Sequence, residues 1–177
     1  MTQRKMFITF FALCFVVVLP VTSLYAIDSE QTRQTILMIK GVRVVVEDPQ
    51  PNIQKYVQRF GLTKEQLQTT IEQRLMKAGI TMLDQEKWLK TAGRPILYIN
   101  INTHEYQKYW YAYTIIVDLR QIVTLETNPD VRTLASTWSV NMAGIANIGN
   151  LDTINKNINV LVDRFIEARQ SLLAKTK

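Results

Sequence analysis

Two carboxylates and an amide lie close together at a point where the chain could bind a small ligand or a cation. Glu47 and Asp48 directly follow a valine-rich stretch, and Asn52 comes four residues after Asp48. Carboxylate and amide oxygens are the ligands that hard cations prefer, and open α/β sheets often bind ligands beyond the carboxyl ends of their strands. These residues predict a ligand-binding loop, with a cation as one candidate. Pro49 and Pro51 also allow a simpler interpretation, in which the segment is only a turn.

The other residues that could carry out chemistry do not form a catalytic set. His104 is the only histidine, so a histidine-rich metal site is excluded and no Ser-His-Asp arrangement can be assigned. Gly144 and Gly149 have the spacing of a phosphate-binding loop, but Asn150 and Leu151 replace the required Lys and Ser/Thr. We therefore expect no enzymatic activity, no cofactor and no resident metal.

Aromatic residues are densest between positions 106 and 113. The odd-numbered members share the parity of the apolar positions around them, which favours the core side of a strand; they are Tyr109, Tyr111 and Tyr113. Trp110 has the opposite parity, and Tyr106 and Lys108 lie beside it at the predicted tip. Aromatic side chains with a polar edge are enriched at protein interfaces and at membrane–water boundaries. The pattern predicts a hairpin tip that docks a protein partner or contacts lipid.

The even-numbered positions of the same strands form a second candidate surface. Their side chains are mixed rather than strongly charged, and the face could simply be solvated, as antiparallel sheets allow. Tyr98 and Ile116 favour contact with a partner or with a second copy of the chain. The candidate contact residues of this face and of the hairpin tip are Tyr98, Asn100, Asn102, His104, Tyr106, Lys108 and Trp110.

The first half of the chain predicts the elements that precede these strands. A near-continuous β-branched run within residues 36–47 is typical of a strand buried on both faces. Thr63 and Gln66 form a capping box that begins a helix, and Gly79 ends it because glycine adopts the left-handed cap at little cost. Residues 80–83 then form a short second strand.

The next two strands must pair with odd positions facing odd positions. Their apolar residues fall on odd numbers from Leu97 to Thr103 and from Tyr109 to Leu119, and directly opposed residues share a face. A two-residue turn at Gln107 and Lys108 would break this parity. The sequence therefore predicts either an odd-length loop centred on Gln107 or a bulge.

The remaining elements complete a two-layer domain. Asp84 caps a short helix, and a third strand follows Asn128-Pro129-Asp130, with Leu134 and Trp138 on its apolar side. Asp152 caps a final amphipathic helix. The order is β-α-β-(short α)-β-β-β-α, in which the first crossover is right-handed. The fold class is α/β, an α+β two-layer sandwich with a mixed five-stranded sheet and both long helices on one face.

The first 26 residues have the order of a secretory signal peptide. A positive start is followed by an apolar run to Leu19, then Pro20 and small residues that favour cleavage after Ala26 or, as second choice, after Ser23. Cys14, the only cysteine, lies within this segment. Residues 27–35 form a polar leader and residues 36–177 a single domain. The protein is expected in the bacterial periplasm, where a cysteine-free exported domain fits; the alternative is an inner-membrane anchor formed by an uncleaved signal.

The charge of the chain limits its partners. The whole chain has a net charge of +6, and without Arg4 and Lys5 it keeps 19 basic and 15 acidic residues, a net charge of +4. These charges are scattered, whereas nucleic-acid binding calls for a concentrated basic face. We expect an envelope protein partner or a homo-oligomer, with peripheral contact to an anionic membrane as a further option, and no nucleic acid.

The element order resembles the N-terminal domain of TolB and the related α/β domains of CsgG-type secretion and outer-membrane assembly proteins. The segments that carry the resemblance are the valine strand Val42–Val46, the helix Lys64–Ala78, the strand Leu97–Asn102 and the closing helix Asp152–Leu172. The resemblance implies a non-enzymatic envelope component acting as an interaction or assembly module. The alternative function is a periplasmic protein that binds a small ligand or a cation through the loop after the first strand.

Overall fold

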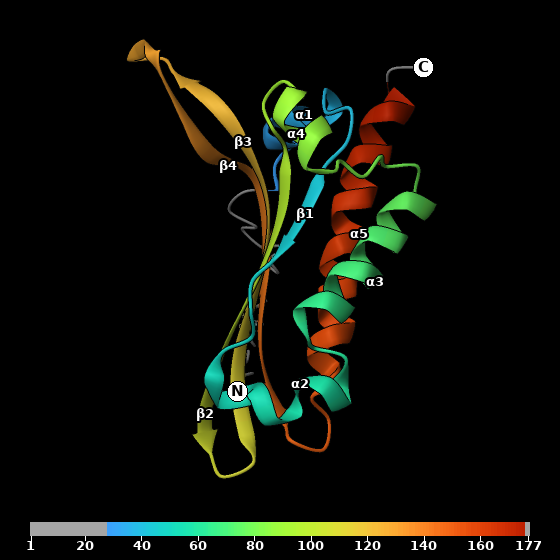
Figure 1. Cartoon of the computed structure of the whole chain (residues 1–177), viewed down its shortest axis with the longest axis vertical. Helices are drawn as coiled ribbons and strands as arrows, with labels where there is room; N and C mark the ends of the chain where they lie inside the picture. The colour runs from blue at the N-terminus through green and yellow to red at the C-terminus, as the bar shows by residue number, and fades with distance from the viewer. Residues whose placement is uncertain (1–27, 176–177) are drawn as a thin grey trace, which may run out of the picture.

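The computed structural model describes residues 28–175 (Figure 1), so the predicted signal peptide and Cys14 lie outside the described residues. The elements in chain order are α1 (Glu30–Leu37), β1 (Arg43–Val46), the 3-10 helix η1 (Pro51–Ile53), α2 (Gln54–Phe60), α3 (Lys64–Lys77), α4 (Gln85–Lys90), β2 (Ile96–Gln107), β3 (Trp110–Leu125), β4 (Asn128–Asn147) and α5 (Asp152–Lys175). No helix in this part of the chain has the length and apolarity needed to cross a membrane.

The sheet is mixed, as predicted, but residues 28–175 form four strands rather than five. Its order is β1-β2-β3-β4, with β1 parallel to β2 and the other pairs antiparallel. The segment 80–83, expected to be a strand, contributes only an isolated bridge between Val42 and Met82. It has no room to extend, because Gly79 (φ 76°) closes α3 and Asp84 already caps α4.

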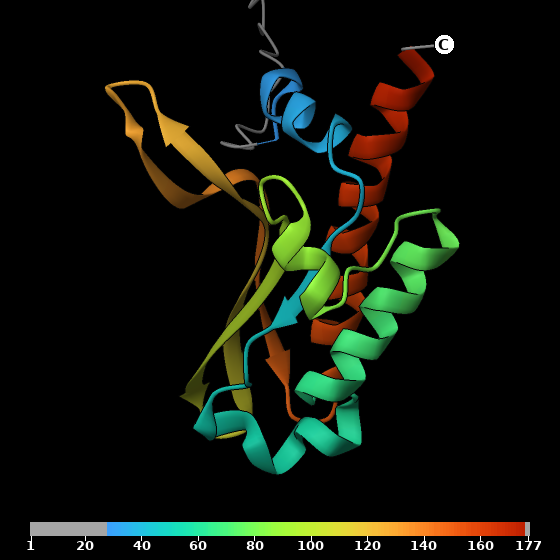
Figure 2. The same cartoon turned by 45° about the horizontal axis from the view of Figure 1, so that its top comes forward.

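Both long helices cover one face of the sheet, as predicted. Figures 1 and 2 show α3 and α5 side by side on that face. The oxygen of the Thr63 side chain accepts from the Gln66 backbone N–H at 3.2 Å and so caps α3. In the core, the ring centroids of Trp138 and Phe165 lie 5.3 Å apart. These contacts join β4 to α5.

The first strand is buried on one face only, which corrects the expectation of burial on both. Val44 and Val46 are buried, whereas Arg43 and Val45 are half-buried. Since β1 is an edge strand and the long helices lie on a single side, the alternate residues of β1 point to the other face.

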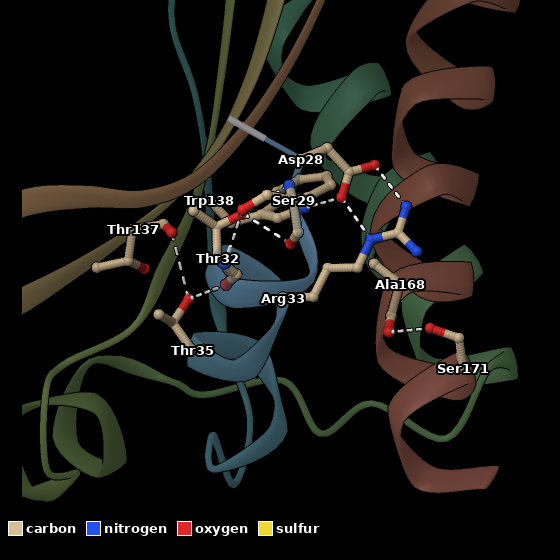
Figure 3. Close-up of polar contacts among 9 residues, drawn as sticks. All are labelled: Asp28, Ser29, Thr32, Arg33, Thr35, Thr137, Trp138, Ala168 and Ser171. Atoms are coloured by element: carbon tan, nitrogen blue, oxygen red, sulfur yellow. Dashed lines mark hydrogen bonds and ion pairs between the residues drawn. The ribbon is translucent and has the colours of Figure 1, made fainter. Parts of the chain in front are cut away.

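The segment expected to be a polar leader forms most of helix α1. Ser29 caps the helix in a reciprocal capping box with Thr32, and Ile36 at the other end is fully buried. Arg33 donates two hydrogen bonds to Asp28, which also accepts one from the Trp138 indole (Figure 3). Residues 28–37 are therefore packed onto the core.

The β2–β3 connection contains the predicted bulge. Odd positions face odd positions from Leu97 opposite Leu119 to Glu105 opposite Tyr111, and the register then shifts to pair Gln107 with Trp110. Tyr109 in the tight turn has a φ of 78°.

The hairpin of β3 and β4 extends beyond the body of the domain as an arm (Figure 1). A second bulge lies at its base, where Leu119 faces Trp138 but Arg120 faces Ser136. The extra residue moves later side chains to the opposite face. Leu134, expected on the core side with Trp138, is therefore 49% exposed on the other face, which corrects that prediction.

Candidate functional site

The face of the sheet opposite α3 and α5 carries the predicted contact residues, and we call it the open face. It is formed by the even-numbered side chains of β2 and β3, because the odd-numbered ones from Leu97 to Thr103 and from Tyr111 to Leu119 lie in the core. Among the described elements, α4 approaches one end of this face, where Trp88 lies against Arg43. The other end is formed by the β2–β3 hairpin.

Three of the predicted contact residues form a polar row with Glu47 in the middle of the open face. Tyr98 and Asn100 each donate a hydrogen bond to the Glu47 carboxylate. Asn102 donates to the Asn100 side chain, and Gln50 Nε2 donates to Asn102 Oδ1 at 3.1 Å. This row of hydrogen bonds links the end of β1 to β2.

Arg120 closes the same row from the neighbouring strand. Its guanidinium lies 3.4 Å from the centroid of the Tyr98 ring and donates to Asp118 Oδ2 at 3.3 Å. Asp118 is buried and faces Ser139, which is also buried. The middle of the open face is therefore held by internal contacts.

The four other predicted contact residues lie at the hairpin end and are available for contact. They are His104, Tyr106, Lys108 and Trp110, all of them exposed. Tyr106 is 65% exposed and Trp110 44% exposed. Within residues 28–175 none of the four side chains has a hydrogen-bond partner; Lys108 lies 5.1 Å from the Tyr109 ring centroid. The seven residues predicted as one contact surface therefore fall into two groups. Tyr98, Asn100 and Asn102 are hydrogen-bonded within the open face, and the four at the hairpin end have no side-chain hydrogen bond within residues 28–175.

Small side chains make a shallow hollow beside this end of the face. The register places His104, Ala112 and Ile145 in one row across β2, β3 and β4. The Ala112 side chain is short and lies between the larger side chains of His104 and Ile145, of which Ile145 is 62% exposed. The hollow measures about 310 Å³ and is lined by Gln50, Asn102, Thr103, His104, Ala112, Tyr113, Thr114, Ala143 and Gly144.

The tyrosines assigned to the core by parity divide between core and tip. Tyr111 and Tyr113 are buried, as predicted, but Tyr109 is 48% exposed because it occupies the turn. Tyr111 donates a hydrogen bond to the Asn52 carbonyl oxygen at 3.2 Å, and burial raises the pKa of its hydroxyl. Tyr109 therefore joins Tyr106 and Trp110 as an exposed aromatic side chain at the hairpin end.

The loop after β1 does not bring its three candidate ligands together. Glu47 points to Tyr98 and Asn100, Asp48 pairs with Lys64 at 3.2 Å, and Asn52 forms two hydrogen bonds with Thr103 at 2.7 Å. Each candidate is thus used by a different neighbour. In the described part of the chain, no group of three or more His, Cys, Asp or Glu side chains could hold a metal ion.

Shifted carboxylate pKa values occur at helix starts and ion pairs and not among the contact residues of the hairpin end. The Lys87 backbone N–H lowers the pKa of Asp84 at the start of α4, and Lys156 lowers that of Asp152 at the start of α5. Asp28 has a lowered pKa, chiefly because Arg33 donates to it. These shifts have structural causes.

Sequence reasoning missed Ile145 and its small neighbours Ala112 and Ala143. A signal was present, because odd positions of β4 between Asn141 and Asn147 have the parity of the non-core side. Without the register that opposes Ala112 to Ile145, this alternation could not be connected with the even positions of β3.

Neither a scan against protein-family models nor a search of the curated proteins finds a match to this chain.

Proposed function

We propose that this protein is an exported, non-enzymatic component of the bacterial envelope that acts as an interaction module. Its contact site is the hairpin end of the open face, formed by His104, Tyr106, Tyr109, Trp110 and Ile145. The single observation that carries this proposal is the exposure of large apolar and aromatic side chains there without side-chain hydrogen bonds within residues 28–175.

The composition of this end is that of a protein-binding surface. Trp and Tyr are enriched among the residues that contribute most to binding energy, and such residues tend to fill or flank pockets. Here Trp110 and Ile145 lie near a hollow of about 310 Å³ whose walls include alanine and glycine. A partner side chain can enter this hollow while the exposed rings cover it. Gln50 and Asn102, which line the hollow, are hydrogen-bonded to each other, so this side of it is organised before a partner binds.

The proposed location rests on the sequence of residues 1–26, which has the order of a signal peptide. The expected compartment is the periplasm, and the expected partner is an envelope protein or a second copy of the chain. This agrees with what the resemblance to TolB-type and CsgG-type domains implies, although a fold alone does not determine a function.

Photo-crosslinking in intact cells tests the proposal. A photoreactive phenylalanine analogue is placed at Trp110 and, as a matched control, at Val160 of α5, which is 45% exposed but belongs to the helical layer. We expect a discrete protein adduct from position 110 that is absent from position 160, in the periplasmic or membrane fraction.

The outcomes separate the partners. An adduct of twice the mass of the chain identifies a homo-oligomer, and any other discrete adduct identifies a different envelope protein. A chain that pellets with membranes and gives only lipid adducts favours peripheral membrane contact over a protein partner. Equal labelling from positions 110 and 160 would contradict the proposal, as would a chain recovered only from the cytoplasm.

A further inference from the structure

A cavity at the opposite end of the open face has features that the interaction site does not use. It measures about 570 Å³ and lies between the end of α4 and the base of the β3–β4 arm. Its lining residues are Trp88, Leu89, Lys90, Thr91, Ala92, Gly93, Arg94, Ile96, Ile122, Arg132, Thr133 and Leu134. The volume falls within the usual range for sites that bind small molecules.

The cavity is well separated from the hairpin end. Ile96 is the first residue of β2 and Tyr106 is ten residues further along the same strand, which corresponds to about 33 Å. The two sites can therefore be tested independently, and an inference about the cavity does not depend on the proposed interaction module.

One wall of the cavity is apolar. Ile122 faces Leu134 across β3 and β4, and Ile96 begins the adjacent strand. Leu134 is 49% exposed and Leu89 46% exposed. These two leucines come from different elements and both line the same cavity. An apolar group that entered the cavity would remove both from water.

The two arginines of the cavity lack acidic partners. Within residues 28–175, neither Arg94 nor Arg132 forms an ion pair, whereas Lys90, the third cation of the lining, pairs with Glu86 of α4, and the cap residue Asp84 pairs with Lys87. The local acids are thus neutralised and the arginines are not. Guanidinium groups bind carboxylate and phosphate groups through paired hydrogen bonds.

The indole of Trp88 lies at the same place. Its Nε1 is buried and has no hydrogen-bond partner within residues 28–175. The Trp88 ring also lies near two guanidinium groups, 5.4 Å from Arg43 and 5.9 Å from Arg94, measured to the ring centroid. Because this donor is closed off from solvent, the part of Trp88 that a ligand in the cavity would meet is its ring.

The backbone is strained where it presents Arg94. Gly93 has a φ of 74° and Arg94 a φ of 42°, a left-handed conformation that residues other than glycine rarely adopt. The Gly93 carbonyl oxygen accepts from the Ile122 backbone N–H at 2.7 Å, which ties this turn to the base of the arm. This hydrogen bond keeps the turn that carries Arg94 next to Ile122 of the apolar wall.

We propose that this cavity binds an amphipathic anion, with a carboxylate or phosphate headgroup held by Arg94 and Arg132 and an apolar chain packed against Ile96, Ile122 and Leu134. The apolar wall and the two unpaired arginines each account for one half of such a ligand.

Calorimetric titration of the protein isolated from cells that express the full chain tests this proposal. The probes are decanoate, decyl phosphate, the neutral analogue decanol and inorganic phosphate, each below its micelle-forming or solubility limit. We expect decanoate or decyl phosphate to bind, and decanol and inorganic phosphate each to bind at least about five-fold more weakly. Preference for one of the two amphipathic anions supports the site and identifies its headgroup.

Two variants locate the binding. Arg94→Gln and Arg132→Gln change exposed side chains, and each should weaken binding of the amphipathic anion by about five-fold or more. Arg59→Gln, an exposed arginine of α2, is the control and should have no effect. The proposal is overturned if neither amphipathic anion binds, if decanol binds as tightly as decanoate and decyl phosphate, or if the three arginine variants behave alike.

Tryptophan fluorescence provides an independent readout. In a Trp110→Phe background, the remaining tryptophans are Trp88 and the fully buried Trp138. Addition of the amphipathic anion should change the emission, and a further Trp88→Phe substitution should remove that change. An unaltered spectrum at saturating ligand, or a change that persists without Trp88, would contradict binding in this cavity.

Discussion

Asp28 accepts a hydrogen bond from the indole Nε1 of Trp138 at 2.9 Å, which joins two residues that are 110 positions apart in the chain. Arg33 donates to both oxygens of the same carboxylate at 2.6 and 2.7 Å (Figure 3). The Trp138 ring is fully buried, so this contact fastens the start of the described chain to the centre of the core.

Stability should depend on pH through Asp28. Its pKa is lowered from 3.8, chiefly by the hydrogen bond from Arg33 and also by that from Trp138. A lowered folded-state pKa gives stability that is present above the unfolded value of 3.8 and is lost as the pH falls through the folded value. Asp28→Asn should cost about 1.5–3 kcal/mol in free energy of unfolding at pH 7, and less as the pH falls below 3.8.

Denaturant unfolding between pH 7 and pH 2.5 measures this dependence. The matched control is Asp130→Asn, because Asp130 is exposed on the arm and its carboxylate has no partner within residues 28–175. It should change stability by less than about 0.5 kcal/mol at either pH. A cost of Asp28→Asn that stays constant across this range would show that the charge of Asp28 does not stabilise the fold.

Helix α1 should contribute to the stability of the domain. Ile36 is fully buried, so Ile36→Ala should lower the free energy of unfolding by about 2–5 kcal/mol through lost burial and the cavity left behind. Met38→Ala removes a side chain that is 83% exposed and should cost less than about 0.5 kcal/mol. Equal costs in thermal or denaturant unfolding would mean that α1 does not pack as described.

The meander was predictable because its signals are local. Alternation of period two predicts the faces of β2 and β3. The parity conflict at Gln107 predicts a bulge or an odd-length loop, and the register shift between Glu105 and Gln107 is such a bulge. The caps at Thr63 and Asp84 likewise lie at the starts of α3 and α4, since a cap is a short-range interaction, whereas Asp152, also expected to be a cap, is the first residue of α5.

The failures depend on contacts that are distant in the chain. Residues 28–37 are polar enough to suggest a leader, and their place in the core depends on Trp138, more than a hundred residues away. The bulge opposite Arg120 moved Leu134 to the open face, and no local pattern marks it. The loop carboxylates Glu47 and Asp48 were grouped by sequence distance, but their side chains have different partners.

Gly144 should be required by the ring that lies across it. A Cβ built on Gly144 would lie 2.6 Å from Tyr113 Cζ. Tyr113 is 5% exposed and its hydroxyl accepts from Asn157 Nδ2 at 2.7 Å, so the ring cannot move without losing that contact. We expect Gly144→Ala to lower the free energy of unfolding by about 1–3 kcal/mol.

The matched control for this substitution is Gly149→Ala. Its Cβ would lie 3.5 Å from Asn147 Oδ1, an ordinary contact. This variant should unfold within about 0.5 kcal/mol of the unmodified protein. If Gly144→Ala is as harmless as Gly149→Ala in denaturant unfolding, the Tyr113 ring does not occupy the position described.

Divalent cations should not stabilise the protein through the loop after β1. A ligand that binds only the folded state must raise the apparent melting temperature, but Glu47, Asp48 and Asn52 do not converge on one point. We expect the melting temperature to be the same with millimolar Ca²⁺ or Mg²⁺ as with a chelator. An increase in melting temperature that disappears in Glu47→Gln would show that the loop does bind a cation.

Substitutions at the hairpin end should separate binding from stability. Trp110 is 44% exposed and Ile145 62% exposed, whereas Trp138 is fully buried. Trp110→Ala and Ile145→Ser should therefore change the free energy of unfolding by less than about 0.5 kcal/mol, while Trp138→Ala should lower it by about 3–5 kcal/mol.

If the proposed partner binds at this end, the same two surface variants should abolish its recovery. Truncating a central aromatic or aliphatic anchor of an interface costs about 2 kcal/mol or more, roughly a thirty-fold loss of affinity. The measurement is affinity isolation from envelopes at matched protein levels, with Val160→Ala on α5 as the surface control. Undiminished recovery of the partner with both Trp110→Ala and Ile145→Ser would place the contact surface elsewhere on the molecule. Reduced recovery together with reduced stability would show instead that these side chains support the fold.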